Sequence, residues 1–427
     1  MLPMFLVLFF TLFLSAPIGI AIVSACLTAT VTNPEVPLNL NYIFRNMVSG
    51  IDSYPLLAIP LFILSGVIMA RGGISKKLFD FFAFFVGDKT AGMPITVIIT
   101  CLFYGAISGS SPATTAAVGA MAIPLLVNLG YDRVFVTALV ATAGGLGVII
   151  PPSIPFIVYG LASSASVGKL FIAGIIPGIL IGLCLMVYSW IYCRSHGEDK
   201  NKLKQNAARL RARGFIGTLM DSFWALLTPV FILGGIYGGI VTPTEAANVS
   251  VIYSLVVSIY IYKTLAWKDI PEVLREAVKT FAPMMLVVAA ATVFTRTLTM
   301  LNIPQTIVEV MSQALVDKVM FLLCVNLILL VVGMFMEPLT SILILTPILF
   351  PLVTSFGVDP IHFGVIMVVN LAIGFVTPPV GVNLYVASGM TGISVMSIAK
   401  KAVPFLVAFF IALILITFIP WLSLALL

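Results

Sequence analysis

Long apolar runs recur along the whole chain and are separated by short polar joints. Runs of about 20 apolar residues are long enough to cross the hydrocarbon core of a bilayer as helices. The pattern therefore predicts an all-α polytopic membrane protein. The first run, residues 2–30, carries no charged residue and is predicted to be one membrane span rather than a cleaved signal peptide.

Two apolar runs are interrupted near their middles in a way that does not suit a continuous helix. Residues 95–128 contain the tip 108–112, SGSSP, and residues 320–353 contain the tip 336–338, MEP. Proline removes a backbone donor and breaks a helix. Each run is predicted to be a re-entrant hairpin of two half-length helices. Residues 75–86, basic at one end and aromatic beyond it, are predicted to form a helix along the membrane interface.

A double proline breaks one further span in each half of the chain. The two sequences are GGLGVIIPPSIP at 144–155 and AIGFVTPPVGVN at 372–383. Moving the chain along itself by 227 residues superposes proline and glycine positions without a gap: Pro124 on Pro351, Gly130 on Gly357, Pro151 on Pro378 and Pro177 on Pro404. Because these residue types control backbone geometry, the sequence predicts an internal structural repeat.

The distribution of charge predicts how the repeats lie in the membrane. Of 427 residues, 61% are hydrophobic and 9% charged, and lysine and arginine cluster at 194–213. If this basic loop is cytoplasmic, the tracing places all but four of the 22 basic residues inside. The exceptions are Arg45, Lys169, Arg296 and Lys318. The N-terminus is then cytoplasmic, the C-terminus periplasmic, and the two repeats have inverted topology, as in secondary transporters.

The sequence lacks the features of nucleic-acid-binding proteins, of disulfide- or metal-stabilised proteins and of enzymes. The basic residues lie in joints between spans, which gives no nucleic-acid surface. Five cysteines in or beside apolar runs form neither a disulfide framework nor a metal-binding spacing. No paired carboxylates, metal ligands or activated nucleophile occur at the predicted midplane, so we expect a protein that is not an enzyme.

The interruptions are the predicted sites of chemistry. Broken helices leave carbonyl oxygens that suit Na⁺ and helix N-termini that suit carboxylates. Ser108 at the first tip, Ser153 after the first double proline and Thr377 before the second are well placed for such roles. Glu337 is a carboxylate deep in the membrane and therefore a functional candidate. Arg296 is a candidate for attracting an anion.

Each candidate also has a structural explanation that the sequence leaves open. The double prolines are compatible with simple helix kinks, and the SGSS tip with close helix packing by small residues. Glu337 is suited to begin a helix before Pro338. Arg296, near the end of a span, is compatible with a side chain that extends to the interface.

Four segments together resemble the large membrane subunit of tripartite ATP-independent periplasmic (TRAP) transporters, within the ion transporter superfamily. They are GAISGSSPATTAAVGAMAIPL, GGLGVIIPPSIPFIVYG, GMFMEPLTSILILTPILFPL and GFVTPPVGVNLYV. The resemblance covers essentially the whole chain. It implies an elevator-type fold in which a transport domain of both hairpins and both broken spans moves against a scaffold.

The repeat and this resemblance divide the chain as follows. The first repeat is 1–193, with scaffold and interfacial arm at 1–90, hairpin and broken helix at 91–168, and a scaffold-type span at 169–193. The segment 194–242 is a basic cytoplasmic loop and linker helix. The second repeat is 243–427, with scaffold and arm at 243–318, hairpin and broken helix at 319–392, and a final span at 393–427.

The resemblance also implies two Na⁺ sites, many of whose ligands are backbone carbonyls. The first would use Ser108, Ser111, Gly145, Val148 and Pro151, and the second Gly333, Glu337, Gly374 and Thr377. Family members often have aspartate at the position of Glu337. Ser108, Ser153, Glu337 and Arg296 remain the candidates for contact with substrate.

A TRAP large subunit resides in the bacterial inner membrane among lipids. It works with a four-helix small membrane subunit and a periplasmic binding protein. The resemblance implies import of a small carboxylate, and the separate large subunit favours sialic acid (N-acetylneuraminate). Two alternatives stay open: a stand-alone Na⁺/dicarboxylate or citrate symporter of the same superfamily, and an ion channel.

Overall fold

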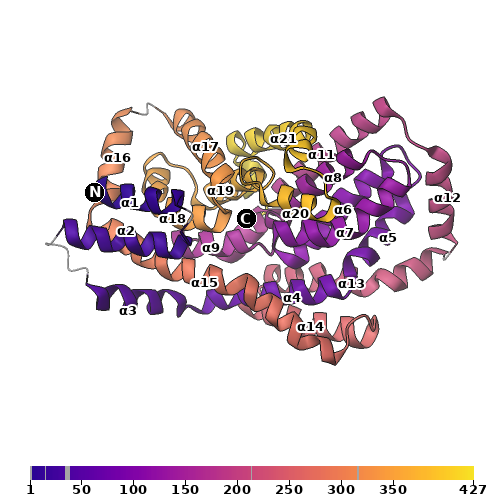
Figure 1. The fold of residues 1–427 in the computed structure, drawn as a ribbon, viewed down its shortest axis with the longest axis horizontal. Helices are drawn as coiled ribbons and strands as arrows, with labels where there is room; N and C mark the ends of the chain where they lie inside the picture. The colour runs from indigo at the N-terminus through magenta and orange to yellow at the C-terminus, as the bar shows by residue number, and fades with distance from the viewer. Residues whose placement is uncertain (1, 15, 34–38, 213, 315–316) are drawn as a thin grey trace.

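The computed structural model describes residues 2–14, 16–33, 39–212, 214–314 and 317–427, and over these ranges every regular element is helical. Among them, nine helices are long and apolar enough to cross a membrane. The predicted all-α fold is confirmed. Figure 1 shows the hairpins and interrupted helices along one side of the molecule and five other helices along the opposite side. These five are α3 (Leu40–Ile51), α4 (Ala58–Arg71), α13 (Gly214–Tyr237), α14 (Pro243–Val256) and α15 (Ile270–Met300).

The predicted repeat is visible in the bounds of the helices. In the first half the arm, hairpin and interrupted helix are α5 (Ile74–Val86), α6 (Gly92–Ser108), α7 (Ser111–Asn128), α8 (Arg133–Ala143), η2 (Gly144–Val148) and α9 (Ile154–Ser163). In the second half they are α16 (Ile303–Ala314), α17 (Lys318–Phe335), α18 (Pro338–Ser355), α19 (Pro360–Gly374) and α20 (Val382–Thr391). A shift of 227 residues places α7 on the bounds of α18. Both hairpins and both helix breaks are thus confirmed.

Twelve further helices flank these elements in the described part of the chain. They are α3 (Leu40–Ile51), η1 (Tyr54–Leu57), α4 (Ala58–Arg71), α10 (Val167–Ala173), α11 (Ile175–His196), α13 (Gly214–Tyr237), α14 (Pro243–Val256), η3 (Val257–Ile261), η4 (Trp267–Asp269), α15 (Ile270–Met300), α21 (Val395–Phe418) and α22 (Trp421–Leu424). The core lies around α8, η2, α9 and α19, and Ile361 to Gly374 of α19 is buried throughout. The interrupted helices therefore stand at the centre of the protein.

The prediction of a single span over 2–30 is wrong. The chain forms two shorter helices, α1 (Leu2–Phe13) and α2 (Ile18–Thr32), which pack against each other side by side (Figure 1). Pro17 immediately precedes α2 and prevents one helix from running through this point. The tracing counted this run as one membrane crossing, and the two helices do not support that count. The side of the membrane on which each terminus lies therefore stays a prediction.

Two polar joints between apolar runs contain helices, and one of them was expected to be a basic cytoplasmic loop. The joint 33–54 contains α3, which packs on α15. The basic segment 194–213 contains α12 (Lys200–Arg211), seen at one edge of Figure 1. Both Nη atoms of Arg211 donate to the two carboxylate oxygens of Asp88 at 2.8 Å, and these hydrogen bonds lower the pKa of the Asp88 carboxyl. Local pairing of this kind lets a charged helix form outside the bilayer.

Candidate functional site

The first hairpin turns at Gly109 and Ser110. Helix α6 ends at Ser108, and Gly109 has φ of +60°, a left-handed conformation that glycine adopts without strain. The Ser108 hydroxyl lies 2.9 Å from that of Thr114, so the two arms of the hairpin are bonded to each other. The backbone N–H of Ser110 also donates to Ser108 Oγ at 3.4 Å. The tip is therefore a defined polar turn.

This tip packs directly on the first double-proline break. The N–H of Ile154, the first residue of α9, donates to the carbonyl oxygen of Gly109 at 3.4 Å. Ser153 Oγ donates to the carbonyl oxygen of Val148 at 2.5 Å and accepts from the Phe156 N–H. A carbonyl oxygen has two lone pairs, so Val148 retains one for another partner. The tip and the break thus form one unit, as the predicted first Na⁺ site requires.

The second hairpin and second break meet in a similar way. Gly333 of α17 and Gly374 of α19 lie so close that a Cβ on Gly374 would be 2.2 Å from the Gly333 carbonyl oxygen. The N–H of Val380 donates to the Met334 carbonyl at 3.1 Å, and Thr377 Oγ1 donates to that of Ile373 at 2.9 Å. Three of the four predicted ligands of the second site, Gly333, Gly374 and Thr377, therefore belong to one junction.

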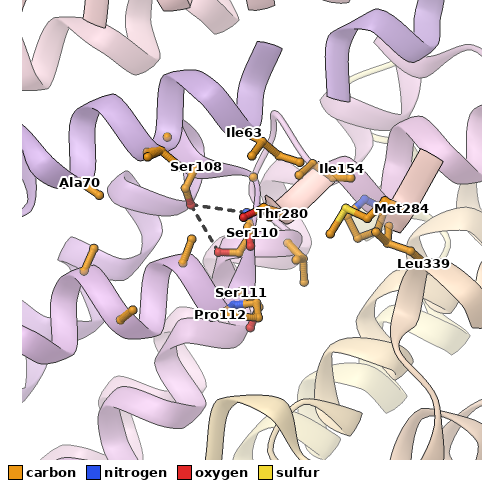
Figure 2. Close-up of a pocket in the computed structure, with 18 of the residues that line it drawn as sticks. Ile63, Ala70, Ser108, Ser110, Ser111, Pro112, Ile154, Thr280, Met284 and Leu339 are labelled. Atoms are coloured by element: carbon orange, nitrogen blue, oxygen red, sulfur yellow. Dashed lines mark hydrogen bonds between the residues drawn. The ribbon is translucent and has the colours of Figure 1, made fainter. Parts of the chain in front are cut away.

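A cavity of about 490 Å³ lies between the first hairpin tip, the second hairpin tip and helices α4 and α15. Figure 2 shows part of its lining, with Ser108, Ser110 and Ser111 from the first tip, Ala70 from α4 and Met284 from α15. Four of the predicted site residues line it: Ser108, Ser111, Val148 and Glu337. The cavity is therefore built from both repeats.

The other predicted residues lie elsewhere. Gly145, Pro151 and Ser153 are buried beside the first break and do not border the cavity. Arg296 is exposed on α15 and is not part of the lining. Its role in attracting an anion stays a prediction, as does direct contact of Ser153 with substrate.

Charged residues that sequence reasoning did not select border the same cavity. Arg71, at the end of α4, approaches Glu276 of α15 with its Nε and Nη2 atoms at 2.9 and 2.8 Å from Oε2. Glu272 lies 3.6 Å from the same guanidinium. Nothing local in the sequence indicated this pairing, because Glu276 lies 205 residues from Arg71 along the chain.

Three helices begin at the cavity wall. They are α7 at Ser111, α9 at Ile154 and α18 at Pro338, each with proline in its first turn. Unpaired N–H groups and the helix dipole make such N-termini favourable surroundings for an anion. Among the described lining residues the charged ones are Arg71, Glu276 and Glu337, and Arg71 is already paired. The first N–H groups of α9 are already bonded to Gly109 and Ser153, so α9 contributes its dipole alone. The site can thus hold an anion mainly through the N-termini of α7 and α18 and through hydroxyls.

A helical fold of two repeats with paired hairpins, interrupted helices and a cavity between them defines a membrane transporter. The family model of the tripartite ATP-independent periplasmic transporter, DctM component, matches residues 5–422. The chain belongs to this family, and the resemblance stated from its motifs is confirmed. It is therefore a multi-pass membrane protein and a transporter subunit rather than an enzyme.

Several relatives support this assignment. The chain is 45% identical to the C4-dicarboxylate TRAP transporter large permease protein DctM of Pseudomonas aeruginosa, over 88% of this chain and 86% of that one. It is 43% identical to the isethionate TRAP transporter permease protein DctMQ of Oleidesulfovibrio alaskensis, over 96% of this chain but 64% of the relative's length. The sialic acid TRAP transporter large permease protein SiaM of Vibrio cholerae is 35% identical, over 97% and 95%.

A solved structure shares the fold at low sequence identity. The YdaH transporter of Alcanivorax borkumensis superposes with a TM-score of 0.67 at 15% identity, covering 95% of this chain and 98% of that one. This similarity concerns the arrangement of helices alone. It supports the helical fold independently of the sequence motifs.

Proposed function

We propose that this protein is the translocating subunit of a Na⁺-coupled TRAP transporter that imports a small organic anion. The proposal rests on three helix N-termini, from both repeats, that converge on one cavity. Their dipoles favour an anion there, although the one basic residue among the described lining residues, Arg71, is already paired. The relatives are named for isethionate, C4-dicarboxylates and sialic acid, which are all organic acids. A carboxylate or sulfonate would occupy the cavity.

Sodium is the proposed coupling ion. The first site would use the tip and break that carry Ser108, Ser111 and Val148, with Gly145 and Pro151 behind them. The second would use the junction of Gly333, Gly374 and Thr377. Carbonyl oxygens freed at helix breaks are the ligands that secondary transporters offer to Na⁺. Glu337, the remaining candidate ligand of the second site, borders the cavity and an adjoining apolar one of about 410 Å³.

The proposed movement is of elevator type. Helices α4 and α15 form one wall of the cavity, and the hairpin tips form the other. Sliding of the hairpins and interrupted helices past α4 and α15 would carry a bound anion and its ions across the membrane. The pair of Arg71 and Glu276 stands at the end of this wall that the charge distribution assigns to the cytoplasm.

The proposed assembly contains two further proteins in the bacterial inner membrane and periplasm. A four-helix small membrane subunit would stabilise the scaffold, and a periplasmic binding protein would deliver the substrate. Exposed apolar side chains of α13, including Ile216, Met220 and Phe231, provide surface for lipid or such a subunit.

A substrate screen tests this proposal. Uptake of labelled isethionate, succinate and N-acetylneuraminate is measured in proteoliposomes that contain both membrane subunits, with the cognate binding protein added outside. We expect one organic acid to accumulate and the neutral sugar N-acetylglucosamine to be excluded. Uptake without binding protein would favour the stand-alone symporter, unsaturable flux would favour a channel, and uptake of only the neutral sugar would overturn the anion assignment.

A further inference from the structure

Asn383 links the two repeats at the centre of the protein. It lies at the start of α20, directly after the second break, and its side chain is fully buried. Its Nδ2 donates at 2.8 Å to Ser111 Oγ, at the beginning of α7, and at 2.8 Å to the carbonyl oxygen of Ala141 in α8. Both partners belong to the first repeat, 272 and 242 residues away.

The orientation of this amide is determined by its partners. A backbone carbonyl only accepts hydrogen bonds, so the group that faces Ala141 must be the nitrogen. The backbone N–H of Asn383 donates in turn to the carbonyl oxygen of Phe375, on the second break, at 3.0 Å. One residue therefore connects the second break with the first hairpin and with α8.

The connection has no counterpart in the other repeat. The shift of 227 residues that superposes the repeats places Asn383 on Phe156, whose side chain has no hydrogen-bonding group. The link therefore runs from the second repeat to the first alone. The two proposed ion sites are related by the repeat, but the hydrogen bond that joins them is made by one repeat only. At this bond, the state of one site can affect the other.

We propose that Asn383 is a positioning residue that couples the two ion sites, an inference that rests on the Na⁺ coupling proposed above. Ser111 Oγ has two lone pairs, and the bond from Asn383 occupies one and directs the other. The geometry of a first-site ligand thus depends on where α20 lies. The position of α20 depends on the second break, to which Phe375 and Thr377 belong. Sodium binding at the second site then favours binding at the first.

The test is a sodium titration of thermal stability on the full chain in detergent. Potassium replaces sodium so that ionic strength is constant. A ligand that binds only the folded state raises the Tm, so the wild-type Tm is expected to rise cooperatively with Na⁺. Asn383→Leu keeps the number of side-chain heavy atoms and the branch at Cγ, and it removes the hydrogen bonds. We expect its half-saturating Na⁺ concentration to rise about tenfold and its Hill coefficient to fall to about one.

A matched control exists in the same half of the protein. Asn370 of α19 is equally buried, and its Nδ2 also donates twice, to Asn326 Oδ1 at 2.7 Å and to the Ile366 carbonyl at 2.9 Å. Neither partner belongs to a proposed ion site. Asn370→Leu is expected to lower the Tm without sodium and to leave the half-saturating concentration and the Hill coefficient unchanged.

The outcomes separate this inference from the proposal beneath it. An Asn383→Leu protein with wild-type half-saturation and Hill coefficient would overturn the role of Asn383 alone. A wild-type protein whose Tm is the same in Na⁺ and K⁺ would overturn the sodium proposal itself. If Asn383→Leu does not fold, Asn383→Ser replaces it, because a serine hydroxyl is too short to reach both partners. The half-saturating Na⁺ concentration and the Hill coefficient of Asn383→Ser then test the role of Asn383 in the same way.

Discussion

Uptake is expected to be abolished when Gly374 is replaced by alanine. The new Cβ would stand 2.2 Å from the carbonyl oxygen of Gly333 and 2.5 Å from its carbonyl carbon. These are backbone atoms, so no side-chain rotation relieves the contact, and α17 and α19 must separate. Overpacking of this kind destabilises by about 1–3 kcal/mol. The separation also distorts the junction proposed to hold the second Na⁺.

A second glycine controls for the substitution itself. Gly389 is exposed in α20, and a Cβ on it would meet no atom within 4 Å. Gly389→Ala is expected to transport as the wild type does, since alanine is the better helix former. Substrate uptake into proteoliposomes is compared at equal amounts of inserted protein. A Gly374→Ala transporter of wild-type activity would contradict the proposed close contact.

Bulky residues at Ser108 and Thr377 are expected to stop transport while the protein still reaches the membrane. Ser108 is 2% exposed, and the backbone of α4 passes so close that a Cβ on Gly66 would lie 3.2 Å from Ser108 Cα. Ser108→Leu therefore presses the added atoms against α4 or into the cavity, and it removes the hydroxyl bonded to Thr114. Thr377→Leu removes a hydroxyl from the second junction.

Expression and folding distinguish this result from simple unfolding. Membrane content is measured by immunoblot and monodispersity by size exclusion, beside uptake of substrate. Ser195→Leu, at an exposed position near the end of α11, serves as control and is expected to be neutral. Normal uptake by both Ser108→Leu and Thr377→Leu would refute the assignment of these residues to the ion sites.

Much of the fold could be predicted because proline and glycine control the backbone locally. Helix ends and starts were indicated by Pro112, Pro338 and the two double prolines. Because the two halves are repeats, a helix break predicted in one half was also expected at the matching position of the other half. The same local reasoning failed at 2–30, where Pro17 alone signals the fold-back within an apolar run. It also missed α12, whose Arg211 pairs with Asp88 in the turn after α5.

The candidate site was predicted only where its residues follow a local pattern. Ser108, Ser111 and Glu337 adjoin helix breaks and were found in the cavity wall. Arg71 and Asn383 were missed because their importance depends on partners more than 200 residues away. Such contacts arise from the packing of whole helices, and no spacing within a short segment encodes them.

The central claim, sodium-driven uptake, is tested most directly by initial rates in proteoliposomes with an imposed ion gradient. The complete system contains both membrane subunits, the binding protein and its labelled substrate. We predict accumulation above the external concentration with an inward Na⁺ gradient and none when K⁺ replaces Na⁺ on both sides. Accumulation of the same extent in K⁺ would contradict the claim.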